Sequence, residues 1–145
     1  MGRHKLVTDP QQLWDMFIDY KNETKSDPFI IVDYVGKDAI PVNRMKERAL
    51  TMEGYEEYVA CIDGMPWELR DYFANTDNRY SDFTTVCSRI RRAIRQDQIA
   101  GGLAGLYNPS ITQRLNGLVD KQEVKTVKEQ PLFTDDPINE ETTPE

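Results

Sequence analysis

The first helix can be read from the spacing of apolar side chains along the start of the chain. Thr8-Asp9-Pro10 is a capping sequence with proline at an early helical position, so we expect the helix to begin there. It should end within 22–28, because a residue before proline disfavours helical backbone. Residues 1–8 are expected to form a flexible basic N-terminus. Side chains that recur at helical spacing predict one apolar face, formed by Leu13, Trp14, Phe17, Ile18 and Tyr20.

Residues 29–45 show a different pattern and are predicted to form a β-hairpin. Residues 29–35 are rich in β-branched and aromatic types, and Gly36-Lys37-Asp38 supplies a turn. The second arm follows, and Pro41 places it at the edge of a sheet.

Two short helices are predicted next, joined by a tight turn. The first begins after Thr51, a good N-cap, and is broken at Asp63-Gly64. The second opens at Pro66-Trp67 and reaches about Phe73. Residues 51–74 therefore have a helix-turn-helix-like pattern, which many αα-hairpins share.

A long amphipathic helix is predicted to start at Ser81-Asp82. Its apolar face is formed by Phe83, Val86, Cys87, Ile90 and Ile94. At about 100° per residue, Arg91, Arg92 and Arg95 lie on the opposite face, and Arg89 flanks them.

The small residues at 101–105 should allow close helix packing, and a last helix is predicted between Asn108-Pro109 and Asn116-Gly117. Within residues 122–130, Val124 and Val127 alternate with charged residues and suggest a strand. A lone strand is not stable in water, so we expect it to pair with another copy of the chain.

The predicted fold is mainly α, with a helical core domain over residues 9–121 and residues 131–145 as a disordered acidic tail. The length of 145 residues fits one domain. The net charge is −7, but residues 129–145 hold six acids and no base, which leaves 18 basic and 19 acidic residues elsewhere. The longest apolar run, at 29–32, is too short for a membrane span, and no apolar stretch follows the N-terminus. We expect a cytoplasmic protein that does not contact a membrane.

Residues suited to catalysis or metal binding are few. Cys61, Cys87 and His4 are too few for a structural zinc site, so we expect no metal or cofactor and two buried thiols. The sequence has no P-loop, and a Ser-His-Asp triad would have to use the terminal His4. We therefore expect a protein that is not an enzyme.

Two basic clusters are the candidate DNA-binding residues. Arginine suits phosphate contacts because its planar, permanently charged fork donates paired hydrogen bonds. For a single subunit, a solvated face paired with nearby Asp and Glu is the simpler interpretation. In a ring of identical subunits, the arginines would instead recur around the ring and form a positively charged belt. The clusters are Arg44, Lys46 and Arg48, and Arg89, Arg91, Arg92 and Arg95.

The order of these elements resembles the small terminase subunit of tailed phages that package DNA by a headful mechanism. The similarity covers about residues 9–128, and its most specific parts are the Arg-Ala-Leu-Thr-x-x-Gly segment at 48–54 and the Asn-Pro-Ser-Ile…Leu-Asn-Gly-Leu-Val-Asp-Lys segment at 108–121. The resemblance implies a ring of identical subunits in the host cytoplasm, with residues 122–130 joining a β-barrel shared between subunits. It also implies binding to double-stranded viral DNA at the packaging start site. The large subunit, an ATPase and nuclease, would be recruited and regulated.

The sequence departs from this family at two places. Members more often have Leu-Gly-Leu where this chain has residues 115–118, and well-known relatives have a basic tail. Here the tail is acidic, so we expect it to contact the large subunit, or to limit nonspecific DNA contact, rather than to bind DNA. The acids assigned to the large-subunit contact are Asp135, Asp136, Glu140 and Glu141.

Two alternative functions remain open from the sequence. A helix-turn-helix transcription regulator would use residues 51–74 and the arginine helix, and it should be a dimer. A structural adaptor ring would have no DNA role.

Overall fold

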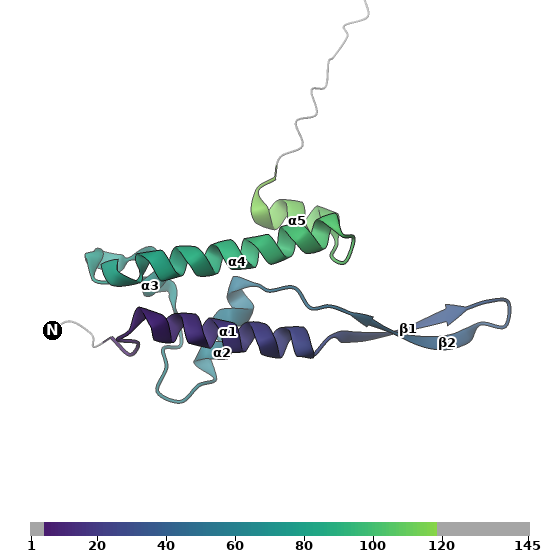
Figure 1. The fold of residues 1–145 in the computed structure, drawn as a ribbon, viewed down its shortest axis with the longest axis horizontal. Helices are drawn as coiled ribbons and strands as arrows, with labels where there is room; N and C mark the ends of the chain where they lie inside the picture. The colour runs from purple at the N-terminus through teal and green to yellow at the C-terminus, as the bar shows by residue number, and fades with distance from the viewer. Residues whose placement is uncertain (1–4, 119–145) are drawn as a thin grey trace, which may run out of the picture.

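The computed structural model describes residues 5–118, which form a helical body with a β-hairpin extending from it (Figure 1). Two single 3₁₀ turns, Thr76–Asn78 and Ser81–Phe83, lie between the helices α3 (Arg70–Ala74) and α4 (Thr84–Leu103). The predicted strand with Val124 and Val127, and the tail with Asp135, Asp136, Glu140 and Glu141, lie outside the described residues. The helices and strands are α1 (Pro10–Ser26), β1 (Phe29–Val35), β2 (Ile40–Lys46), α2 (Met52–Ala60), α3 (Arg70–Ala74), α4 (Thr84–Leu103) and α5 (Pro109–Asn116).

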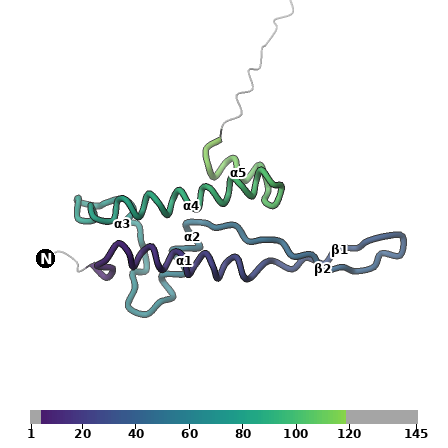
Figure 2. The backbone as a smooth tube through the Cα atoms, viewed as in Figure 1, coloured from purple at the N-terminus to yellow at the C-terminus, as the bar shows by residue number. Residues whose placement is uncertain are grey.

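The body is built on α1 and α4, which lie side by side and run in the same direction in the backbone view (Figure 2). The Asp9 side chain accepts a hydrogen bond from the Gln11 backbone N–H and caps α1, as its sequence predicts. The helix ends at Ser26, ahead of Asp27 and Pro28, which confirms that boundary. None of the described helices is both long enough and apolar enough to cross a membrane.

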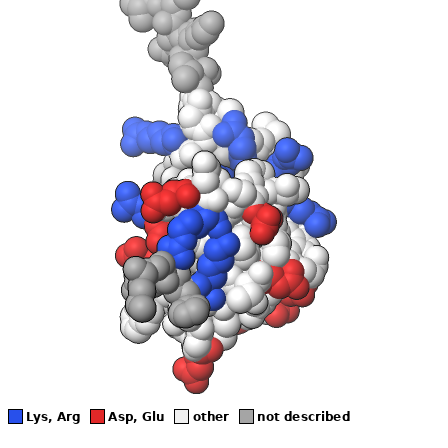
Figure 3. All heavy atoms as spheres, turned by 90° about the vertical axis from the view of Figure 1, so that its left-hand side faces the viewer, with Lys and Arg blue, Asp and Glu red and all other residues white. Residues whose placement is uncertain are grey.

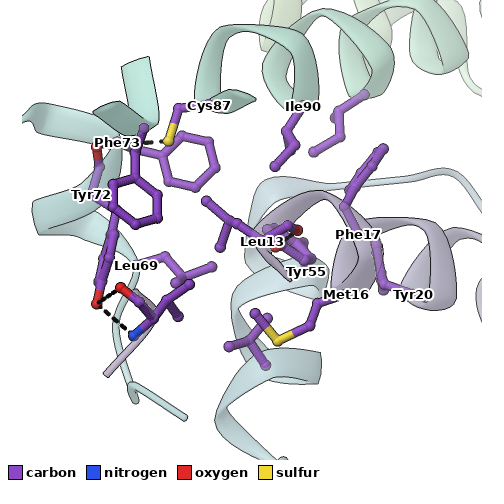
Figure 4. Close-up of a cluster of buried hydrophobic side chains, with 14 of the residues drawn as sticks. Leu13, Met16, Phe17, Tyr20, Tyr55, Leu69, Tyr72, Phe73, Cys87 and Ile90 are labelled. Carbon is purple, nitrogen blue, oxygen red and sulfur yellow. Dashed lines mark hydrogen bonds between the residues drawn. The ribbon is translucent and has the colours of Figure 1, made fainter. Parts of the chain in front are cut away.

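A single apolar core joins α1, α2, α3 and α4 (Figure 4). Phe17 of α1 and Tyr55 of α2 meet edge to face, with ring centroids 5.5 Å apart. The buried Tyr55 hydroxyl donates to the Leu13 carbonyl oxygen at 2.7 Å, so its polar atom is satisfied. From α4, Ile90 and Ile94 enter this core, as the apolar spacing of the long helix predicts.

The hairpin has the predicted position and an uninterrupted antiparallel register. Pairing runs from Phe29 opposite Lys46 to Val35 opposite Ile40. The turn between the strands is closed by a hydrogen bond from the Ala39 N–H to the Gly36 carbonyl, and Gly36 has a φ of 80°, which glycine adopts without steric cost. The hairpin points away from the helices (Figure 1), and its side chains are largely exposed on both faces.

Three local predictions are corrected by the structure. The third helix begins at Arg70 and not at Pro66, because Leu69 has φ −89° and ψ 1° and helical backbone starts only after it. The long helix begins at Thr84; Ser81 donates to the Asn78 carbonyl inside a 3₁₀ turn instead of capping the helix. Val7 is fully buried and its N–H donates to the Tyr72 hydroxyl at 3.0 Å, so residues 5–8 pack on the body rather than being free.

The small residues near the end of α4 do permit close packing. A Cβ atom on Gly102 would lie 2.9 Å from Thr112 Cγ2 of α5, closer than carbon atoms normally approach. The Asn108 side chain caps α5 by accepting from the N–H groups of Ser110 and Ile111. Gly117 ends the helix with a φ of 61°.

The two cysteines differ, although both were expected to be buried. Cys87 is buried against α3, but Cys61 is exposed at the end of α2. Burial raises the pKa of the Cys87 thiol to about 11, while nearby Arg91 acts weakly in the opposite direction.

We predict that a thiol reagent at neutral pH will modify Cys61 rapidly and Cys87 only after unfolding, because thiolate is the reactive form and Cys87 lacks both ionisation and access. Mass mapping of the labelled peptides measures this. Equal labelling of both thiols in the folded chain would contradict the placement of Cys87 in the core. A Cys61→Ser variant is the control, and it should take up no reagent without denaturant.

Candidate nucleic-acid interface

Four arginines project from α4 into solvent along a stretch without any acidic residue. Arg89, Arg91, Arg92 and Arg95 are all exposed. Between Thr84 and Gln96 the helix carries these four cations and no Asp or Glu. The apolar positions Cys87, Ile90 and Ile94 face the core, which explains why the arginines point outward.

Arg89 lies over the body's first helix. Its guanidinium carbon is 3.7 Å from the centroid of the Trp14 ring, which is a stacking distance. Trp14 is half-buried, so the arginine covers the exposed side of the indole and is held in one place. Within residues 5–118 the guanidinium N–H groups of Arg89 form no hydrogen bond or ion pair, so they can donate to a ligand.

Arg91 and Arg95 each contact the end of another helix. An Arg91 guanidinium N–H donates to the Phe73 carbonyl in α3 at 3.0 Å, and one from Arg95 donates to the Asn116 carbonyl at the end of α5 at 2.9 Å. Unpaired carbonyls at helix C-termini attract cations, so both contacts are stabilising. These two arginines therefore link helices while still adding positive charge to the surface.

Arg92 has no hydrogen bond, ion pair or ring contact within residues 5–118. With Arg89 it lines a shallow open hollow of about 440 Å³. The other lining residues are Thr84, Thr85 and Ser88, so every side chain around the hollow can donate a hydrogen bond. Such a set matches the oxygens of a phosphate group.

The basic surface is not neutralised by the protein's own acids. Over the described part of the chain, the salt bridges involve Lys25, Arg44 and Arg48, and none involves the four arginines of α4. The simpler interpretation of the sequence, in which Asp and Glu pair with this face, therefore does not hold within residues 5–118. Viewed from the end of the body that carries α3, the basic side chains gather mainly toward the α4 side and the acidic ones are more frequent toward the opposite side (Figure 3).

The other predicted cluster lies elsewhere, on the hairpin and at its base. Arg44 forms a 2.9 Å ion pair with Asp33 across the hairpin. Arg48 stacks on Phe29, with its guanidinium carbon 3.8 Å from the ring centroid, and its side chain donates to the Asp27 carbonyl. Lys46 is exposed at the end of β2. The structure thus separates Arg44, Lys46 and Arg48 from the α4 arginines and gives two of them structural partners.

A partly buried cluster around Lys25 could not be found by inspecting the sequence, because its members are far apart along the chain. The Lys25 ammonium lies 2.6 Å from Asp97 Oδ1 and 2.9 Å from Glu47 Oε1. It also reaches the Tyr107 hydroxyl at 2.8 Å and the Arg48 carbonyl at 2.9 Å. The other oxygen of Asp97 accepts from the Leu50 N–H. This Lys25 cluster fastens the base of the hairpin to α4.

The charge of Lys25 is set by opposing effects. Partial burial alone would lower the pKa of Lys25, but hydrogen bonds with Asp97, Tyr107 and Glu47 outweigh burial, and the pKa is raised. Lys25 is therefore a permanent cation at the foot of the hairpin. The only sequence signal near this cluster is the pair of glycines beside Tyr107, because a Cβ atom on Gly101 would overlap the Tyr107 ring.

Asn116, at the position where the resembled family differs, has a structural role. Its side-chain amide is buried and donates to Gln98 Oε1 at 3.0 Å. The Gln98 side-chain amide in turn donates to the Leu50 carbonyl at 2.8 Å. This chain of hydrogen bonds connects α5, α4 and the segment before α2. The buried amide of Asn116 is therefore hydrogen-bonded and helps to hold these three segments together.

Within the described residues, no group of three or more His, Cys, Asp or Glu side chains is placed to hold a metal ion. The fold and site together define a mainly helical protein with an exposed basic helix and a projecting β-hairpin. No protein-family model and no curated protein matches the chain.

Proposed function

We propose that this chain is the small subunit of a viral DNA-packaging terminase. In this proposal it assembles into a ring in the host cytoplasm and binds double-stranded viral DNA at the packaging start site through α4. It is not an enzyme itself, and it recruits and regulates the large subunit that holds the ATPase and nuclease. The resemblance of residues 9–128 to that family supplies the biological context.

The observation that carries the proposal is the hollow formed by Arg89, Arg92 and three hydroxyl side chains. Its donors have no acidic partner within the described residues, so a phosphate would not have to displace one. One such site binds weakly, but a ring repeats it, and affinity for DNA rises steeply with the number of phosphates contacted. Because the ring presents many such sites, subunits whose body is nearly neutral can together bind polyanionic DNA.

The helix-turn-helix regulator is the weaker alternative. That motif needs two helices joined by a three- or four-residue turn, with the second helix long enough to enter the major groove. Here residues 61–69 form a wide loop between α2 and α3, and α3 spans only Arg70–Ala74 (Figure 1). The structural adaptor is distinguished by experiment, because it should not bind DNA in a salt-dependent way.

Arg92 offers the cleanest test of DNA binding, because Arg91 and Arg95 also bond to helix ends. We expect Arg92→Ala to weaken binding to duplex DNA about fivefold or more and to reduce the slope of log affinity against log salt by about one. The melting temperature and the mass of the assembly should stay unchanged. Fluorescence anisotropy over a salt series measures both effects.

Arg114→Ala is the matched control, since it removes the same charge from the exposed face of α5. It should leave the affinity within about twofold, as expected of a long-range charge effect in salt. If the two variants weaken binding equally, DNA is attracted only by net charge and α4 is not the interface. If the wild-type chain shows no salt-dependent binding, the adaptor is favoured.

A further inference from the structure

The hairpin has two chemically different faces, which follow from its register. Side chains alternate between faces along a strand, and residues directly opposite each other share a face. One face carries the Asp33–Arg44 ion pair and Lys46 among apolar side chains that are 40–59% exposed, namely Phe29, Ile31, Val35, Ile40 and Val42. The other, here called the uncharged face, consists of Ile30, Val32, Tyr34, Pro41, Asn43 and Met45.

The uncharged face is the most exposed apolar surface of the hairpin. Ile30 and Tyr34 are each 66% exposed and Met45 is 78% exposed. A large side chain presents roughly 150–200 Å² when free, so this face holds about 400–500 Å² of accessible apolar surface, a size typical of interaction sites. A two-stranded hairpin is also only marginally stable by itself in water. We therefore expect the uncharged face to be covered by another apolar surface.

A second uncharged surface lies in a groove between α4 and α5. The groove has a volume of about 270 Å³, and no charged side chain lines it. Leu103 at its rim is 85% exposed and Leu118 is 42% exposed. Its lining includes Ile99, Leu103, Pro109, Thr112, Gln113 and Leu118.

The hairpin is held so that it cannot reach the groove of its own chain. The Lys25 cluster and the stacking of Arg48 on Phe29 fix its base, and the arm points away from the helices (Figure 1). An occupant of the uncharged face must therefore come from another molecule. Every copy of the chain offers a groove without charge, in a protein of which 30% of residues are charged.

We propose that the uncharged face of the hairpin docks into the α4–α5 groove of a second copy of this chain. The hairpin face would bring about 400–500 Å² of apolar surface to the contact, and one of its large side chains would fill the groove of about 270 Å³. Because the surfaces differ, the contact is head-to-tail, and such contacts close into rings when the rotation allows. The inference rests on the proposed function, because it assumes that the chain assembles into a ring. It identifies the contact that links neighbouring subunits of that ring.

The test compares single lysine substitutions in the full-length chain by native mass spectrometry and sedimentation. Val32→Lys, on the uncharged face, should reduce the assembly to monomers. Ile31→Lys, on the opposite face of the same strand, should assemble like the wild type. Leu103→Lys in the groove should also give monomers, whereas Ala100→Lys, exposed on the same helix but outside the groove lining, should assemble. Circular dichroism confirms that each variant is folded.

Mixing the two monomeric variants gives the sharpest result. The Leu103→Lys chain keeps an intact hairpin and the Val32→Lys chain keeps an intact groove, so one good contact can form and a 1:1 dimer is expected. Monomers in the mixture, a wild-type mass for Val32→Lys, or a wild-type chain that is monomeric would each overturn the inference. Assembly of Leu103→Lys alone would also overturn it, because the hairpins would then pair with each other.

The experiments distinguish failure of this inference from failure of the proposed function. A wild-type ring that assembles through the hairpin but does not bind duplex DNA would leave the inference standing and remove the function. A ring that binds DNA through Arg92 while Val32→Lys keeps its mass would do the reverse.

Discussion

Replacing Lys25 with methionine should lower the free energy of unfolding by about 2–4 kcal/mol, somewhat less than the cost of unpairing a fully buried ion pair, because the partners of Lys25 are partly exposed. Asp97 is only 18% exposed and lies 2.6 Å from the lysine, so the substitution would remove its main ion-pair partner. The Tyr107 hydroxyl and the Arg48 carbonyl would also lose a donor. Chemical denaturation followed by circular dichroism measures the loss.

Lys21→Met is the matched control, because Lys21 lies on the exposed surface of the same helix. It should change stability by less than about 0.5 kcal/mol. A second variant, Lys25→Met with Asp97→Asn, removes both charges and should recover part of the loss, since the amide oxygen can still accept from the Leu50 N–H. Equal effects of Lys25→Met and Lys21→Met would show that the cluster does not stabilise the fold.

The same cluster sets a limit to stability in alkali. The pKa of Lys25 is raised in the folded state, so its contribution is complete below the unfolded value of 10.5 and is lost as the pH rises through the higher folded value. Burial raises the pKa of the Tyr55 phenol as well, and its ionisation in the unfolded chain acts in the same direction. Stability should therefore begin to fall above about pH 10, and the Lys25→Met variant should show a shallower fall.

The elements that could be predicted from sequence are those whose signals are local. Asp9-Pro10 and Asn108-Pro109 fix helix starts by satisfying the first N–H groups, and Gly117 fixes a helix end by its positive φ. The hairpin follows from its β-branched runs and the turn at Gly36. Each of these depends on residues within a few positions of one another.

The predictions from sequence are wrong where tertiary packing, rather than local sequence preference, determines the structure. Pro66 is a reasonable start for a helix, yet Leu69 is drawn into the core and the chain becomes helical only after it. Ser81 is a good cap, but the buried Phe83 holds a 3₁₀ turn that takes its place. Cys61 lies exposed just after the last residue of α2, although its apolar surroundings in the sequence suggested burial.

In the candidate DNA site, too, local sequence predicts some features, and others depend on tertiary contacts. Helical spacing was enough to place the four arginines of α4 on an exposed face. It could not show that Arg91 and Arg95 bond to the ends of other helices, or that Arg44 pairs with Asp33, because those contacts depend on tertiary structure. Lys25 and Asp97 are separated by the hairpin and two helices, so no sequence pattern joins them.

The Lys25 cluster connects the hairpin to the helix that bears the arginines. It fastens the base of the hairpin, and Asp97 and Tyr107 belong to the α4 helix and the loop before α5. The proposed subunit contact is therefore tied mechanically to the helix that bears the arginines.

Gly101→Ala should destabilise the protein by about 2–3 kcal/mol, in the range for an overpacked core, although the same change inside a helix ordinarily stabilises by about 1 kcal/mol. The sign reverses because the added methyl group would overlap the Tyr107 ring, which packs directly against the helix backbone at this glycine. The ring cannot move away freely, since its hydroxyl is held by Lys25. Denaturant titration gives the difference in free energy.

A double-mutant cycle with Tyr107→Ala separates the overlap from helix propensity. Once the ring is absent, Gly101→Ala should stabilise the chain by the ordinary 1 kcal/mol or so, so the two substitutions should couple by about 3 kcal/mol or more. Ala100→Gly, at the neighbouring exposed position, gives the propensity term independently. If Gly101→Ala destabilises equally with and without the Tyr107 ring, the glycine is required for another reason. The close approach of that ring would then not be what holds the Lys25 cluster in place.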